Sequence, residues 1–268
     1  MRRFIFRKIS SSASYTSDFL TATGITDATI ISALTAMEAS LTSAGLINYA
    51  TPASNKIKAL YPFVGGTASL HKWNFLDARD LDAAFRLTFF GGWTHSSTGA
   101  LPNGTNGYAN TFLSPSTILT DINSTHISAH LRTNNNTGVY DMGSIGTSST
   151  SRLEIVTRYS DGNAYWGANS AETGITTASS LGLSLSNRRA TNVANYWRAG
   201  TKLQTITSGA TGIPIVSVAL GAINQPDNVV TGYSNREFTL STIGTGLTDT
   251  EITDLTTASN AFQTALSR

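Results

Sequence analysis

The sequence predicts an all-β protein, and three observations lead to that fold class. Charged residues make up 13% of the 268 residues, whereas about 25% is usual for soluble domains. Ser, Thr, Asn and Gly supply the polarity instead, and these residues favour turns and the solvent faces of strands over helices. From about residue 85, short strand-like segments alternate with turn signals at regular spacing, which is typical of a β-sandwich.

Ten segments carry the strand pattern, and turn signals such as Gly91-Gly92 and Asn106-Gly107 lie between them. Asp161-Gly162 is the clearest hairpin turn among these signals. The candidate strands are residues 85–90, 107–112, 125–132, 152–159, 163–168, 181–185, 193–199, 202–206, 213–223 and 235–243.

Two helices are predicted to flank the strands. Residues 26–44 have an N-cap candidate in Thr26 or Asp27 and a glycine, Gly45, where a helix often ends. Their apolar side chains form one stripe that we expect to pack on the sandwich: Ile30, Leu34, Met37 and Leu41.

The second predicted helix covers residues 249–266 and begins with a capping box, in which Thr248 and Glu251 each satisfy a backbone N–H group. One face of this helix is apolar and is predicted to be buried: Ile252, Leu255, Phe262 and Leu266.

Residues 1–24 are predicted to be an extended arm without a core of its own. Alternation over residues 3–9 indicates a short strand, and exposing its large apolar side chains to water would cost roughly 1.5–3 kcal/mol each. We therefore expect this segment to add as a strand to a neighbour's sheet edge; a frayed terminus is the alternative. The candidate partner-binding residues are Arg2, Arg3, Phe4, Ile5, Phe6, Arg7 and Lys8.

Composition excludes several classes of function. The chain has no cysteine, so disulfides, thiolate catalysis and Cys-ligated metals are excluded. Four of the 18 basic residues lie in the first eight positions, which leaves 14 against 16 acidic residues, and nucleic acid is therefore an improbable partner. The apolar run in residues 4–6 is too short for a signal peptide, and no stretch has the length of a transmembrane helix. We expect neither secretion nor a membrane anchor.

Four segments carry a family resemblance: ALYPFVGG at residues 59–66, TFFGGWTHSSTGALPNGTNGYANTFLSPST at 88–117, STHIS to RTNN at 124–135, and the ending from residue 238, where Ser267 replaces the family's glycine. They resemble lectin-like structural proteins of tailed bacteriophages, including crAss-like phages. The resemblance implies one concanavalin A-like or laminin-G-like jelly-roll domain over residues 25–268. It also implies a virion component assembled in the host cytoplasm, in several copies or as a homo-oligomer, with other head or tail components as partners.

Enzyme chemistry finds little support in the residues. A glycoside hydrolase needs two facing carboxylates, and the best strand candidates are Glu154 and Glu237. The E-x-D-x-x-E strand motif of jelly-roll glycanases is absent, as is a G-x-S-x-G nucleophile elbow. Arg152 and Arg158 bracket Glu154 and predict a cross-strand ion pair. We therefore predict that the chain is not an enzyme.

No metal or other cofactor is expected. His126 and His130 share one face of their strand with Ser128 but lie roughly 13 Å apart, too far to bind one metal, so we interpret them as solvent-facing polar positions. The laminin-G likeness suggests calcium, for which Asp141 and Asp161 are loop candidates. The chain has no D-x-[DN]-x-[DN]-G loop.

Glycan binding is the main functional alternative, because sugars stack on aromatic rings while amides fix their hydroxyls. The candidate residues are Trp93, Tyr108, Trp166 and Trp197, with a place in the core as the competing interpretation for each. The sequence thus predicts a virion structural protein, such as a head- or tail-associated decoration or fibre-type component. A host-surface glycan adhesin is the first alternative, and a glycan-degrading enzyme is the second.

Overall fold

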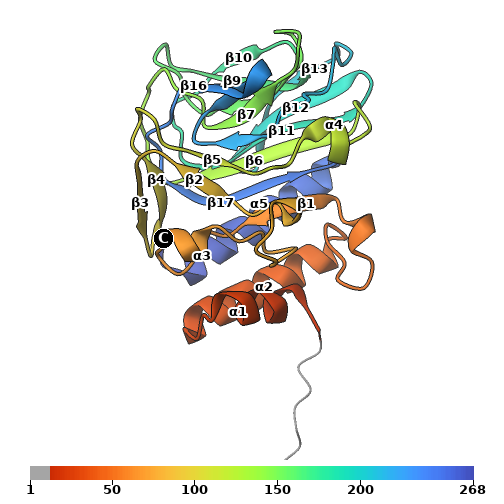
Figure 1. The fold of residues 1–268 in the computed structure, drawn as a ribbon. Helices are drawn as coiled ribbons and strands as arrows, with labels where there is room; N and C mark the ends of the chain where they lie inside the picture. The colour runs from red at the N-terminus through yellow and green to blue at the C-terminus, as the bar shows by residue number, and fades with distance from the viewer. Residues whose placement is uncertain (1–12) are drawn as a thin grey trace, which may run out of the picture.

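Two twisted, almost entirely antiparallel sheets stack face to face (Figure 1). The structure, a computed structural model, describes residues 13–268. The helix-covered sheet has the order β13-β12-β11-β6-β17-β4-β3, with β1 paired to β17. Its strands are β1 (Ile57–Tyr61), β3 (Trp93–Ser96), β4 (Gly99–Pro102), β6 (Thr125–Leu131), β11 (Gly182–Ala190), β12 (Val193–Arg198), β13 (Thr201–Ile206) and β17 (Phe238–Gly244).

The second sheet has the order β10-β9-β8-β7-β14-β5-β2. The pair β15 and β16 branches from it at β7. Its strands are β2 (Thr88–Phe90), β5 (Tyr108–Asn110), β7 (Met142–Ile145), β8 (Arg152–Val156), β9 (Asn163–Ser170), β10 (Thr173–Thr176), β14 (Ala219–Leu220), β15 (Ile223–Gln225) and β16 (Val229–Thr231).

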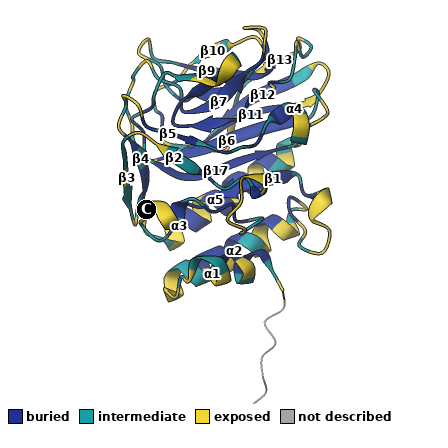
Figure 2. Cartoon of the chain, viewed as in Figure 1, coloured by how far each residue is buried: buried dark blue, intermediate teal, exposed yellow. Residues whose placement is uncertain are grey.

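The main core lies between the two sheets and follows the two-residue period of the strands. On β6, Ile127 and Ala129 point into it, and on β8, Leu153 and Ile155 do the same from the opposite sheet. Trp166 of β9 is fully buried among them. The strand interiors are accordingly dark blue in Figure 2, while exposed residues gather on loops and outer helix faces.

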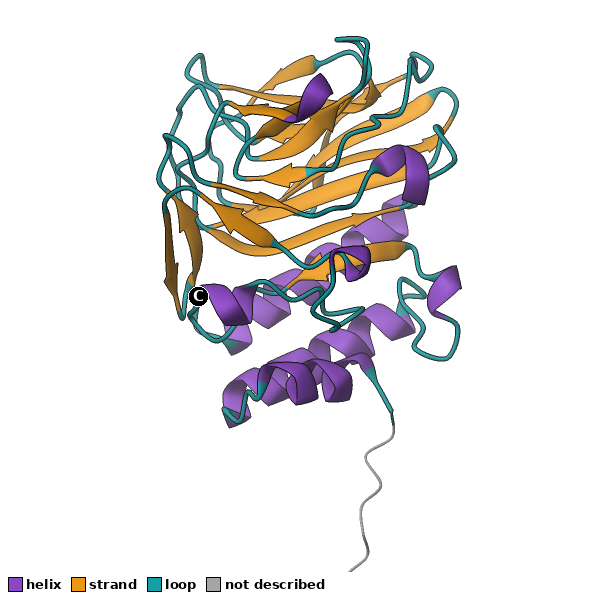
Figure 3. Ribbon diagram, in the orientation of Figure 1, coloured by secondary structure: helices purple, strands orange, loops and turns teal. Residues whose placement is uncertain are grey.

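Helices form a further layer on the outer side of the helix-covered sheet (Figure 3). Helix α5 (Asp249–Ala265) packs against this sheet, α2 (Ala28–Ser43) packs on α5, and α1 (Tyr15–Thr23) packs on α2. A second apolar cluster joins these helices to the sheet. Short helical turns lie in the connecting loops: α3 (Ala68–His71), α4 (Pro115–Ile118), η1 (Pro52–Ser54), η2 (Asp82–Ala84) and η3 (Pro226–Asn228).

The two long helices confirm the sequence prediction. Asp27 caps α2, because its Oδ1 accepts the N–H groups of Thr29 and Ile30. The capping box of Thr248 and Glu251 is present at the start of α5. Burial of each helix's apolar stripe, at Leu34 and Met37 in α2 for example, ties both helices to the second cluster.

Residues 15–23 correct the prediction that residues 1–24 form an extended arm. They form α1, which begins with a capping box between Ser14 and Ser17. The carboxylate of Glu38 on α2 accepts the first N–H groups of the helix, those of Tyr15 and Thr16, at 2.9 and 2.8 Å. Phe19 is fully buried and contacts the ring of Phe75. Tertiary packing therefore makes this short segment helical and part of the domain.

The strand predictions hold for most of the sheets but not for all of them. The hairpin at Asp161-Gly162 joins β8 and β9 as predicted, whereas the segment 213–223 is mostly irregular and contributes only β14 and the first residue of β15. Strands β1, β3, β4, β7, β10 and β16 were not predicted, and all of these except β1 have only three or four residues. In the part of the chain that the structure describes, no helix is long and apolar enough to cross a membrane.

Candidate functional site

The candidate partner-binding residues of the arm, Arg2, Arg3, Phe4, Ile5, Phe6, Arg7 and Lys8, lie outside the described residues. The predicted attachment by strand addition therefore stays a prediction. The other candidate residues all lie in the described part of the chain.

Two of the four aromatic candidates for glycan binding are in the interior. Trp166 is fully buried between the sheets, and its indole N–H donates to Gln204 Oε1 at 2.7 Å. Trp197 is 8% exposed and packs in the cluster beneath the helices, where Lys202 lies over its ring. The glycan-binding prediction was wrong for both residues, because each ring is buried in the core and its indole N–H is hydrogen-bonded within the protein.

The other two candidates, Trp93 and Tyr108, meet at one edge of the second sheet. The indole N–H of Trp93 donates to the carbonyl oxygens of Phe90 and Tyr108, both at 3.2 Å. This contact fixes the end of β3 against β2 and β5. The ring of Trp93 is partly buried and packs against the main core. It therefore has a mainly structural role at this edge and offers little ring surface to solvent.

Tyr108 stacks on Phe90, its cross-strand neighbour, with ring centroids 4.8 Å apart and planes 12° apart. Because Phe89 and Ala109 point into the core, Phe90 and Tyr108 point to the outer face of the sheet. Phe90 is 41% exposed. Tyr233 lies next to Tyr108, with a centroid distance of 6.4 Å. Phe90, which is exposed, and Tyr108 and Tyr233, which are partly buried, together form what we call the aromatic platform.

Polar groups adjoin this platform on the same face. Thr88 and Asn110 form a cross-strand pair that lies two residues away from the pair Phe90 and Tyr108 on each strand. We call Thr88 and Asn110 the polar row. The Oδ1 of Asn110 accepts the N–H of Phe112 at 2.9 Å, while its amide hydrogens have no partner in the described part of the chain. Burial, with the nearby Tyr233, raises the pKa of Tyr108, so its hydroxyl stays protonated and can donate.

The loop before β5 is held by one side chain. Asn103 Oδ1 accepts three backbone N–H groups, from Thr105, Asn106 and Gly107, at 3.0–3.1 Å. The loop packs so closely on Gly91 (φ +67°) that a Cβ there would lie 2.1 Å from the Asn106 carbonyl oxygen. The glycine-rich sequence around β2 and β5 therefore serves to bring these loops together beside the platform.

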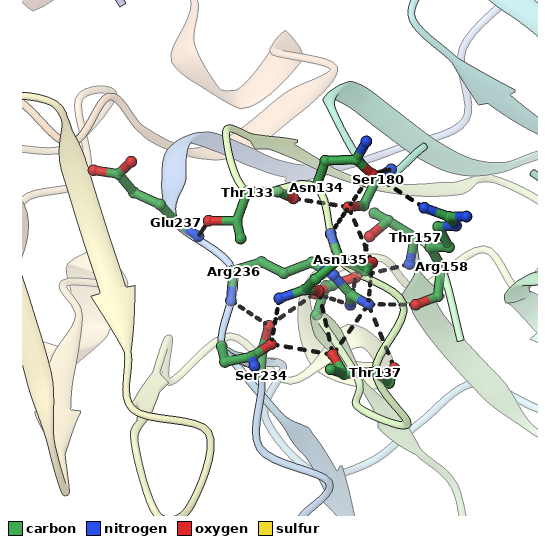
Figure 4. Close-up of polar contacts among 12 residues, drawn as sticks. Thr133, Asn134, Asn135, Thr137, Thr157, Arg158, Ser180, Ser234, Arg236 and Glu237 are labelled. Atoms are coloured by element: carbon green, nitrogen blue, oxygen red, sulfur yellow. Dashed lines mark hydrogen bonds and ion pairs between the residues drawn. The ribbon is translucent and has the colours of Figure 1, made fainter. Parts of the chain in front are cut away.

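A buried ion pair supports the loop that carries Tyr233. Arg236 and Asp141 are both fully buried, with N–O distances of 2.9 and 3.0 Å. Arg236 also donates to backbone carbonyls of the neighbouring loops, including that of Arg158 (Figure 4). The hydroxyl of Ser234 donates to Asp141 at 2.9 Å. Because Gly104 donates to the Ser234 carbonyl oxygen, the same network reaches the loop before β5.

The candidate carboxylates do not face each other. Glu154 lies on β8 of the second sheet, and Glu237 directly precedes β17 of the other sheet, where it pairs with Arg132. Glu154 is fully buried and pairs with Arg152 at 3.0 Å on its own strand, not across strands. Arg158 contacts Asn134 instead. Burial raises the pKa of Glu154 to about 8, against the opposing effect of Arg152.

The histidine prediction was wrong. His126, Ser128 and His130 do share one face of β6, but that face lies under the helix layer, and all three residues are buried. Their hydrogen bonds are internal: His126 contacts Thr245 and Thr242, and His130 contacts Thr239. The alternation predicts the shared face correctly, but it carries no information about a helix placed over that face.

The two aspartates suggested for calcium have other roles. The carboxylate of Asp141 accepts hydrogen bonds from Arg236, from Ser234, and from the N–H and hydroxyl groups of Thr157. Asp161 accepts hydrogen bonds from Asn163 and Tyr165 in the hairpin turn. Over residues 13–268, no group of three or more His, Cys, Asp or Glu side chains is placed to hold a metal ion.

The sequence analysis missed Phe90, Tyr233, Thr88 and Asn110. A signal for the first was present, because the alternation of FRLTFF places Phe90 on the opposite face from Phe89, directly before Gly91-Gly92. Tyr233 joins the platform only through a loop fixed by the ion pair of Asp141 and Arg236, residues 95 positions apart in the chain.

No family model and no curated protein matches the chain. Among solved structures, a Trypanosoma rangeli sialidase mutant displaying trans-sialidase activity matches with a TM-score of 0.55 and 13% identity, over 87% of this chain and 38% of the sialidase. Domain 4 of AbnA, an arabinanase of Geobacillus stearothermophilus, in complex with arabinotriose, gives 0.44 and 15%, over 75% of this chain and 98% of that domain. A Ruminococcus gnavus CBM40 module bound to α2,3 sialyllactose gives 0.43 and 12%, over 63% and 96%.

At these identities the comparisons show the fold alone. This chain spans 38% of the length of that sialidase. Together with the observed strand order, the match confirms the predicted class: a lectin-like jelly-roll β-sandwich with flanking helices.

Proposed function

We propose that this chain is a non-enzymatic glycan-binding module whose contact surface is the aromatic platform with its polar row. The exposed stack of Phe90 on Tyr108, beside the unpaired amide hydrogens of Asn110, carries the proposal. A sugar ring has an apolar face that packs on aromatic rings, while its hydroxyls need fixed polar partners. Rigid strands and the buried ion pair of Arg236 hold these groups in place before any ligand arrives.

We expect Tyr108→Ala to lower glycan binding at least tenfold, since it removes both a ring face and the stacking partner of Phe90. A loss of about 1.4 kcal/mol is tenfold in affinity, which is within the worth of a good aromatic contact. The measurement is binding of the folded full chain to a glycan array, followed by titration of the strongest glycan.

The matched control is Tyr165→Ala. Tyr165 is a half-buried tyrosine near the opposite edge of the second sheet, hydrogen-bonded to Asp161. Its replacement should leave glycan binding unchanged. Equal losses from the two variants, or an array without any bound glycan, would remove the platform as the binding surface.

Catalysis is not part of the proposal, for structural reasons. The two strand carboxylates belong to different sheets, and Glu154 is fully buried with its own arginine. A glycosidase dyad requires carboxyl groups on either side of a bound sugar. The geometry of the platform instead suits binding without bond cleavage.

As a second candidate, we propose that the module is displayed by a tailed-phage particle. Four sequence segments resembling such virion proteins run in order along residues 59–268, and this observation favours the role. In this proposal the segment before α1 binds another head or tail component, and several copies of the sandwich present their platforms to host glycans. The boundary of that segment moves from residue 24 to residue 12, because α1 belongs to the domain.

Deleting residues 2–12 is expected to leave the domain folded and to prevent its incorporation into particles. The described contacts of Ser14 and Tyr15 would persist in the shortened chain. Circular dichroism checks the fold, and protein analysis of purified particles checks incorporation. If the shortened chain is incorporated like the full one, attachment by the leading segment is wrong.

A further inference from the structure

Arg86, the arginine next to the polar row, is already paired with carboxylates of the protein. Arg86 donates to Thr88 of the polar row at 3.4 Å, but it also forms ion pairs with Asp80 and Asp82, at 3.4 and 2.7 Å. Those two carboxylates are about half exposed. Asp80 also pairs with Lys72 at 2.6 Å, so two cations and two anions of the protein balance one another next to the polar row.

Two further arginines, Arg236 and Arg132, are also paired, whereas Arg158 hydrogen-bonds the neutral side chain of Asn134. Arg236, beneath the loop of Tyr233, is paired with Asp141 and has no exposed surface. Arg132 forms an ion pair with Glu237 at 3.3 Å. Among the described residues, the cation–π contacts involve Trp73, Phe112, Trp197 and Phe262, and none involves a ring of the platform.

Neutral hydrogen-bonding groups are what the site offers to a ligand. They are the amide of Asn110, the hydroxyl of Tyr108 and the hydroxyl of Thr88, all on one face next to the stacked rings. These groups can pair with sugar hydroxyls. A carboxylate or sulfate would lose water of hydration at the site, where the hydrogen-bonding groups next to the rings are neutral and supply no opposite charge.

We infer that the platform selects uncharged sugars, namely neutral hexoses, and discriminates against sialylated or sulfated ones. This inference rests on the proposed glycan binding and names the ligand class of the same site. Binding should then depend weakly on ionic strength, because exposed charges that salt could screen make no contribution to it.

The test compares lactose with 3′-sialyllactose, immobilised at matched density, at 50 and 500 mM NaCl. The full chain should bind lactose at least tenfold better than 3′-sialyllactose, with less than a twofold change between the two salt concentrations. Maltotriose and mannotriose extend the neutral set, and 6′-sialyllactose and a hyaluronan tetrasaccharide extend the acidic set. Tyr108→Ala should abolish binding to whichever neutral sugar is bound.

A gain-of-function variant tests the charge argument from the other side. Thr88→Lys adds a cation to the polar row and should raise binding of 3′-sialyllactose at least fivefold, in a manner that 500 mM NaCl suppresses. The matched control is Thr176→Lys, which adds the same charge on an exposed residue of β10 at the opposite edge of the second sheet. This control should leave both affinities unchanged.

The outcomes separate the two claims. Preference for acidic sugars that Tyr108→Ala abolishes would keep the proposed function and overturn the neutral-sugar inference. Binding that Tyr108→Ala leaves unchanged, or no binding to either set, would overturn both. A Thr176→Lys effect equal to that of Thr88→Lys would show general charge attraction and would also contradict the inference.

Discussion

Replacing Arg236 with alanine is expected to lower the free energy of unfolding by about 3–5 kcal/mol. The substitution leaves Asp141 without its partner in a fully buried site, and removing one partner of a buried pair typically costs this much. It also leaves without a donor the carbonyl oxygens that Arg236 holds, including that of Arg158. Urea unfolding of the wild type and the variant, followed by tryptophan fluorescence, gives the difference.

Arg132→Ala is the matched control for this experiment. Arg132 and Glu237 form an ion pair with side chains that are 32% and 18% exposed, and partly exposed pairs contribute about 0–1 kcal/mol. If Arg236→Ala costs no more than Arg132→Ala, the buried pair does not hold the loops together. Arg236→Ala should also weaken glycan binding, because the loop of Tyr233 loses its support.

Acid is expected to destabilise the protein steeply below pH 6.5. Burial lowers the pKa of His71 to about 3 and the pKa values of His126 and His130 to about 4. The unfolded chain takes up these protons near pH 6.5, whereas the folded chain does not until much lower pH. Stability from the three histidines is therefore complete above pH 6.5 and is lost as the pH falls.

The stability contribution of Glu154 changes with pH in the direction opposite to that of the histidines. Its folded pKa of about 8 lies above the unfolded value, so its contribution is complete below about pH 4.5 and is lost as the pH rises through 8. With about 1.4 kcal/mol for each pKa unit, the histidines dominate on the acid side. The net loss from pH 6.5 to 4.5 is on the order of 5 kcal/mol, and the stability maximum should lie near pH 6.5.

Thermal unfolding between pH 4 and 9 measures this profile. The variant His126→Gln should reduce the loss of stability at acid pH, and Glu154→Gln should reduce the loss at alkaline pH. Each variant removes only the contribution of its own titrating group. The groups around the histidines are Glu251 near His126, His95 and Arg268 near His71, and Arg132 and Arg268 near His130. Stability that rises continuously toward pH 4.5 would contradict the burial of these rings.

Local signals in the sequence were sufficient for much of the fold. The capping box at Thr248 and the hairpin turn at Asp161 depend on residues a few positions apart, and the structure confirms both. Helix α1 escaped prediction because much of its support comes from distant residues: Glu38, more than 20 residues away, accepts its first N–H groups, and Phe75 packs on Phe19.

The site was only partly predictable for the same reason. Periodicity places Tyr108 and His126 each on one face of a strand, but it does not say what covers that face. The structure leaves Tyr108 partly exposed and buries His126 under α5. Trp93 and Trp166 are equally aromatic in sequence, and only long-range packing puts the first at the surface edge and the second in the core.

The most direct test of the central claim is a titration of the labelled full chain with lactose and maltotriose, observed through aromatic side-chain NMR resonances. The account predicts that Phe90, Tyr108 and Tyr233 shift together with one dissociation constant while Tyr165 remains unchanged. Shifts confined to Tyr165 or to Tyr15 and Tyr49 in the helix layer, or no shift of any platform ring with either sugar, would contradict glycan binding at this surface.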